Sequence, residues 1–87
     1  MLMQKWLQCN LDRGMFSDEM AVTYPSSGIA RVSVFVPSTD VSGNPGGLGK
    51  VKVRVSVAHR GDTILAILPT SYRDSVAVSE NDLSDAP

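Results

Sequence analysis

The chain has 87 residues, which allows one small domain over 1–87 and leaves no room for a second. Hydrophobic residues make up 43% and charged residues 20%, so the chain is too apolar for intrinsic disorder. Eight basic and nine acidic residues give a net charge of −1, and no overall field draws the chain toward nucleic acid or an anionic membrane. A single cysteine excludes an intramolecular disulfide, and a single histidine excludes a multi-histidine metal site.

The sequence carries no pattern typical of a membrane segment or an export signal. Its longest apolar run, residues 64–68, is far shorter than the span of about 20 residues that crosses a bilayer. The first residues lack the apolar stretch of a secretory signal. Cys9 lies between Leu7 and Leu11 on one face of a predicted strand, a position typical of a buried structural thiol. We therefore expect a cytoplasmic protein without a membrane partner.

Alternating residues predict strands along the chain. Every second residue within 31–36 is a valine, and four valines within 50–57 alternate with Lys, Arg and Ser. Such β-branched side chains favour a pleated strand with one buried and one wet face. Residues 64–68 are apolar at every position, which predicts a strand covered on both faces, and 76–78 repeat the alternation briefly. Because no window has sustained helical spacing, we predict an all-β fold.

Two segments of the chain resemble each other. Residues 31–42 read RVSVFVPSTDVS and residues 73–84 read RDSVAVSENDLS, with six of the twelve positions identical. Asp40 and Asp82 occupy matching places. We predict that each closes a turn by accepting a hydrogen bond from the backbone N–H two residues further on.

The resemblance extends upstream with small shifts. Pro25 matches Pro69, and residues 5–14 align less closely with residues 52–61. These matches predict an internal repeat of two units.

The predicted fold is a small six-stranded barrel or compact sandwich built from two similar three-stranded units. The units cover residues 1–42 and 50–84, joined by a mobile Gly-rich connection over 42–49. One such unit alone would bury too little surface to be stable, so the two must share a core. An intertwined dimer through the Gly-rich connection is the alternative.

No constellation of residues predicts catalysis. His59 lies in a predicted turn, where solvent leaves little to tune it. The segment GNPGGLGK at 43–50 has the wrong spacing for a phosphate-binding loop, and a strand rather than a helix follows it. We therefore expect no enzyme, no cofactor and no metal site.

Two aromatic residues lie opposite the predicted core faces and indicate protein binding. Phe35 shares the wet face of its strand with Arg31, and Trp6 alternates away from Leu7 and Cys9. An exposed aromatic beside an arginine is typical of an interface centre. Trp6, Arg31 and Phe35 are therefore the predicted contacts to a protein partner or to a second copy in a homo-oligomer.

The alternative prediction is a nucleic-acid-binding barrel. Lys50, Lys52 and Arg54 project from one face of a strand, with Arg60 nearby and no acidic residue between. Successive members would lie roughly 6.6 Å apart, close to the phosphate spacing of an extended single strand. Scarce aromatic residues and the net charge favour the protein-binding interpretation.

Overall fold

The computed structural model describes residues 2–25, 31–56 and 64–85 of the chain. Its elements in chain order are β1 (Leu2–Arg13), β2 (Glu19–Tyr24), β3 (Val32–Pro37), the 3-10 turn η1 (Ser38–Asp40), β4 (Val41–Ser42), β5 (Gly47–Ser56), β6 (Ile64–Ile67), β7 (Ser75–Val78), the 3-10 turn η2 (Glu80–Asp82) and β8 (Leu83–Asp85). The all-β prediction is confirmed. None of the described segments forms a helix that is long and apolar enough to cross a membrane.

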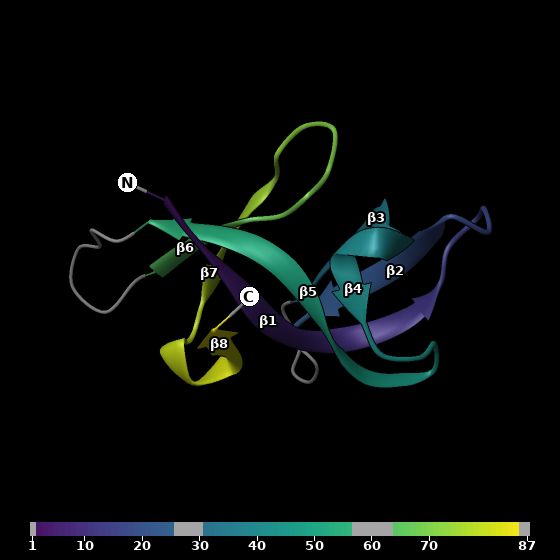
Figure 1. The fold of residues 1–87 in the computed structure, drawn as a ribbon, viewed down its shortest axis with the longest axis horizontal. Coiled ribbons are helices and arrows are strands. Elements are labelled where there is room, and N and C mark those ends of the chain that lie inside the picture. The colour runs from purple at the N-terminus through teal and green to yellow at the C-terminus, as the bar shows by residue number, and fades with distance from the viewer. Residues whose placement is uncertain (1, 26–30, 57–63, 86–87) are drawn as a thin grey trace.

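One antiparallel sheet, curved into a nearly closed barrel, forms the molecule (Figure 1). Six strands follow in the order β3-β2-β1-β5-β6-β7, and the long strands β1 and β5 pair at the centre, from Leu2 with Ser56 to Leu11 with Gly47. The short strand β4 pairs with β5, and the short strand β8 pairs with β1. The six-stranded barrel is therefore confirmed, and two short strands that the sequence did not predict add to it.

Alternate residues of the central strands form the core, as their period of two predicts. Leu7, Cys9 and Leu11 on β1 and Val51 and Val53 on β5 are at most 2% exposed. Full burial of one such aliphatic side chain stabilises a fold by roughly 1.5–3 kcal/mol, so this core, which both halves of the chain share, holds the sheet together. The other buried residues are Met20, Val22, Tyr24, Val36, Val55, Ala66, Leu68 and Val78.

The segment 64–68 is not covered on both faces, so that prediction is wrong. Ala66 and Leu68 are buried, whereas Leu65 is 51% exposed. The reason is the curvature of a single sheet, which turns one face of β6 toward the core and leaves the other in solvent.

The Gly-rich segment 42–49 is also more ordered than predicted. Strand β5 begins at Gly47, so only residues 43–46 connect the short strand β4 to it. A Cβ atom at Gly49 would lie 2.7 Å from the carbonyl oxygen of Ser42. Glycine at this position therefore allows β4 and β5 to approach, which is a packing role rather than a hinge.

The first half of the sheet (β1 to β4) and the second half (β5 to β8) have the same order of elements. Each half ends in a 3-10 turn and a short strand that pairs with the long strand of the other half. Val41 of β4 faces Val51, and Leu83 of β8 faces Leu7. Leu7 on β1 therefore corresponds to Val51 on β5.

The register of the hairpins extends this correspondence. It relates Leu11 to Val55, Val22 to Ala66 and Val34 to Val76. The last pair is the one that the alignment of 31–42 with 73–84 predicts. The upstream alignment of 5–14 with 52–61 does not hold, because it would match buried Leu7 with exposed Arg54. The sequence repeat itself stays a prediction.

Candidate functional site

Each long strand changes its outer partner partway along, which leaves a gap in the sheet. Strand β1 pairs with β8 as far as Leu7 and with β2 from Asn10 onward. Strand β5 pairs with β4 as far as Val51 and with β6 from Arg54 onward. The two gaps occupy corresponding places in the two halves, but only the gap beside β1 is closed by a side chain.

Tyr24 bridges the gap beside β1. Its side chain is buried, and its hydroxyl donates to Asp82 Oδ2 at 2.7 Å and accepts from the Ser79 N–H at 3.0 Å. The phenol thus joins the end of β2 to η2, the turn that leads into β8. Burial raises the pKa of Tyr24; the Asp82 carboxylate adds to this, and the Ser79 N–H works against it. Asp82 therefore accepts a hydrogen bond from the Tyr24 hydroxyl. The sequence had predicted a bond from the backbone N–H two residues further on.

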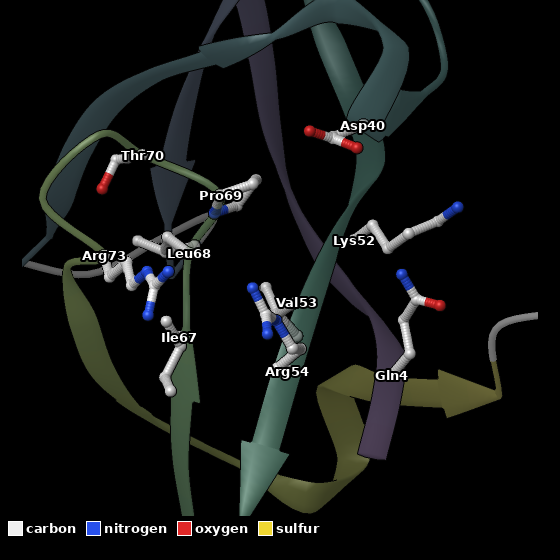
Figure 2. Close-up of a pocket in the computed structure, with 10 residues that line it drawn as sticks. All are labelled: Gln4, Asp40, Lys52, Val53, Arg54, Ile67, Leu68, Pro69, Thr70 and Arg73. Carbon is white, nitrogen blue, oxygen red and sulfur yellow. The ribbon is translucent and has the colours of Figure 1, made fainter. Parts of the chain in front are cut away.

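Leu68 holds the position of Tyr24 in the second half, and each of the two residues is followed by a proline. Leu68 is buried, but it has no hydroxyl that could bridge to η1. The donor is missing as well, because Pro37 precedes η1 where Ser79 precedes η2. The gap beside β5 accordingly remains open as a cavity of about 310 Å³ (Figure 2).

Residues of both halves line this cavity, which we call the β5 cavity. Its walls are Gln4, Asp40, Lys52, Val53, Arg54, Ile67, Leu68, Pro69, Thr70 and Arg73. Asp40 is half-buried, and its carboxylate has no hydrogen-bond or ion-pair partner among the described residues. Arg73 has a left-handed backbone with φ of 53°, an uncommon conformation for a non-glycine residue. In Figure 2, Arg54 points into the space between β5 and the turn after β6, whereas Lys52 extends away from it.

The β5 cavity has the chemistry of a site for an aromatic side chain with a hydroxyl group. An apolar cavity of about 150 Å³ already binds benzene in another protein, so about 310 Å³ admits a phenol ring. The Asp40 carboxylate can accept the hydroxyl hydrogen, as Asp82 does from Tyr24. The guanidinium groups of Arg54 and Arg73 can stack on the ring.

Phe35 lines a second, shallower cavity on the other side of the same turn. Phe35 is 49% exposed, and this cavity of about 220 Å³ shares Pro69 and Thr70 with the β5 cavity. Tyr72, at the tip of the turn, is 91% exposed. The turn of residues 69–73 therefore carries an exposed tyrosine and separates an exposed phenylalanine from the β5 cavity.

The structure does not bring the three predicted partner contacts together. Trp6 faces Lys52 across the β1–β5 pair, and the lysine ammonium lies 5.3 Å from the centre of the indole ring. Phe35 faces Ala21 of β2, and Ala21 faces Asp12, six residues along β1 from Trp6 and therefore roughly 20 Å away. Arg31 is exposed and lines a different depression beside Asn10 and Gly46.

The predicted basic face is present on β5. Lys50 and Arg54 are exposed and Lys52 is half-buried, opposite the buried valines of the same strand. Lys52 covers a face of the Trp6 ring and so leaves that face unavailable for stacking on a base. Arg60, like His59, lies outside the described residues.

Sequence reasoning missed the β5 cavity, although one signal for it was present. The match of Pro25 with Pro69 places Tyr24 and Leu68 in corresponding positions, and their difference is what opens the cavity. Arg73 joins the site only because β7 returns beside β6, which no local pattern indicates.

Other features of the described residues offer less. A cavity of about 530 Å³ lies beside β8, but its cation Lys5 already forms a 2.6 Å ion pair with Asp85, which lowers the pKa of that carboxyl. Burial raises the pKa of the Cys9 thiol to about 11, which makes it a poor nucleophile. Within the described ranges, no group of acidic residues or cysteines is placed to hold a metal ion.

Comparison of the chain with protein-family models, with curated proteins and with solved structures finds no match.

Proposed function

We propose that this protein is a small protein-interaction module whose β5 cavity binds a tyrosine side chain of its partner. One observation carries the proposal: the gap that Tyr24 bridges in the first half stays open in the second, with an unpaired carboxylate at the matching position. A cytoplasmic location belongs to the same proposal, since the only cysteine is buried and reduced.

The contacts available in the β5 cavity favour tyrosine over other side chains. Ile67 and Leu68 supply apolar walls, and Asp40 supplies a hydrogen-bond acceptor. A phenylalanine would leave Asp40 desolvated and unpaired, and a buried unpaired group costs about 1–3 kcal/mol. A phosphate or carboxylate would be attracted by Arg54 and Arg73 but repelled by the same Asp40.

The test is an NMR titration of the ¹⁵N-labelled chain with N-acetyl-tyrosinamide, with N-acetyl-phenylalaninamide as the matched control. We expect shift changes at Asp40, Val53 and Leu68, and binding of the tyrosine amide at least about 5-fold tighter than that of the control. In Asp40→Ala this preference should vanish. Equal binding of both amides, or shifts confined to other surfaces, would refute the proposal.

Nucleic-acid binding is the second candidate, and the placement of Arg73 favours it. Arg73 lies in the turn that precedes β7. It adds a third cation to Lys52 and Arg54 of β5, and all three line one cavity. Binding of single-stranded DNA or RNA through about four phosphate contacts predicts a log–log salt slope near −3 between about 50 and 200 mM salt. Fluorescence anisotropy measures this slope, and an absence of binding at low salt would remove the candidate.

A further inference from the structure

We infer that the tyrosine which enters the β5 cavity is Tyr72 of a second copy of the chain. This inference rests on the proposed function and names its partner. The chain contains two tyrosines, and Tyr24 already uses its hydroxyl within its own fold. Tyr72 is 91% exposed.

The turn that carries Tyr72 is held in a fixed shape. The Arg73 N–H donates to the Thr70 carbonyl oxygen at 3.0 Å, the Thr70 hydroxyl donates to Asp74 Oδ2 at 2.8 Å, and the Asp74 N–H donates back to the Thr70 hydroxyl oxygen at 3.0 Å. The Leu68 N–H also donates to the Asp74 carbonyl oxygen at 2.8 Å, which closes the base of the turn. A side chain presented on an ordered turn loses less entropy on binding than one on a loose loop.

The position of the turn suits a reciprocal contact between two copies. The turn projects from the body of the molecule, and it also walls the cavity through Thr70 and Arg73 (Figure 1). In a two-fold dimer the same surface meets itself, so a projecting group and its receptor must lie on the same face of the chain. Tyr72 and the β5 cavity meet this condition because Tyr72 directly precedes Arg73, a residue of the cavity wall.

The surroundings of Tyr72 supply the rest of an interface. Phe35 lies on the opposite side of the turn from the β5 cavity and is 49% exposed. In the dimer Arg54 and Arg73 would pack against the ring of the incoming Tyr72, which turns the cationic wall into an attractive contact. Each dimer would hold two such tyrosines, so one substitution in the chain removes two contacts from the dimer and weakens its association through both.

The test is the oligomeric state by sedimentation equilibrium over about 10 µM to 1 mM chain. We expect a monomer–dimer equilibrium for the natural chain and an association at least about 100-fold weaker for Tyr72→Ser, because each dimer loses two buried aromatic anchors. Tyr72 is exposed in the monomer, so this change should leave the circular dichroism spectrum and the unfolding midpoint unchanged at a concentration at which the natural chain is monomeric. A natural chain that stays monomeric at 1 mM, or a Tyr72→Ser variant that dimerises equally well, would overturn the inference.

A mixing experiment identifies the cavity as the receptor. Leu68→Tyr places a phenol where Tyr24 stands in the first half and should fill the cavity from within. We expect Leu68→Tyr and Tyr72→Ser each to be monomeric alone and to form a heterodimer when mixed, because one copy retains the tyrosine and the other the cavity. If Leu68→Tyr does not fold, Asp40→Ala takes its place. The absence of a heterodimer from two folded variants would contradict the reciprocal contact.

The two proposals fail in different ways. If N-acetyl-tyrosinamide binds in the β5 cavity and the chain remains monomeric, the cavity serves a foreign tyrosine and only the second copy is excluded. If the natural chain dimerises and the tyrosine amide does not bind the Tyr72→Ser variant, in which no tyrosine of a second copy occupies the cavity, the dimer uses another surface and both proposals fall.

Discussion

Replacing Tyr24 with phenylalanine removes one oxygen atom and tests how the two halves are held together. The ring stays, so apolar burial is unchanged, but Asp82 loses a donor at 2.7 Å and the Ser79 N–H loses an acceptor at 3.0 Å. A hydrogen bond to a charged group contributes about 1.5–3 kcal/mol, and an orphaned N–H adds to its loss. The site is only partly buried, so water recovers some of this, and we expect a net loss of about 2–3 kcal/mol.

The assays are urea unfolding and thermal unfolding, each monitored by circular dichroism and by the fluorescence of Trp6. For a domain of this size a loss of 2–3 kcal/mol lowers the melting temperature by roughly 10–20 °C. Tyr72→Phe is the matched control, because the same atom is removed from a side chain that is 91% exposed. At a concentration at which the chain is monomeric, it should change the unfolding free energy by less than about 0.5 kcal/mol. A Tyr24→Phe variant as stable as this control would refute the bridging role of Tyr24.

Three further predictions concern the core and the β5 cavity. Burial raises the pKa of Cys9 from 9.0 to about 11, so the thiol loses its proton at a lower pH in the unfolded chain than in the folded one. The unfolding free energy should therefore be unaffected below about pH 9 and fall by about 2–3 kcal/mol as the pH rises to about 11. Urea titrations across this pH range measure the fall, which should be smaller in Cys9→Ala. Gly49→Ala should destabilise the fold by about 1–3 kcal/mol, because its Cβ would collide with Leu11, whereas the control Gly47→Ala meets no atom within 4 Å and should be neutral or slightly stabilising in the same unfolding assay. Leu68→Tyr should raise the unfolding free energy by about 1 kcal/mol through a new bond to Asp40, and a fall of more than about 2 kcal/mol would show that the two halves are not equivalent there.

Much of the architecture follows from local pattern. The alternation of valines in 50–57 fixes which face of β5 is buried, and Val51, Val53 and Val55 all lie in the core. The same argument places Cys9 inside and Phe35 outside, as the structure shows. Successive side chains of a strand point to opposite faces whatever the strand pairs with, so the alternation in the sequence predicts the buried face correctly.

Features that depend on partners far along the chain were beyond such reasoning. The run 64–68 looks doubly buried because its residues are all apolar, yet the curvature of the sheet decides that Leu65 faces solvent. The 3-10 turns η1 and η2 and the short strands after them arise because the last segment of each half crosses to the long strand of the other half.

The candidate site shows the same division. Lys52 and Arg54 could be identified as one wet face from spacing alone, and both line the β5 cavity. Arg73 and Asp40 could not be added to them, since they reach the cavity from turns separated in sequence. The three predicted partner contacts, two aromatic residues and an arginine, were chosen by residue type and strand face. Neither property tells how far apart they lie, and of the three only Phe35 lies beside the 69–73 turn.

The central claim is that the β5 cavity is the empty counterpart of the place that Tyr24 fills. Intermolecular nuclear Overhauser effects between the ring protons of N-acetyl-tyrosinamide and the methyl groups of the chain test it most directly. We predict effects to the methyls of Ile67 and Leu68, which wall the cavity, and their loss in Leu68→Tyr. Effects only to methyl groups outside the cavity wall, or none at a saturating concentration of the amide, would contradict it.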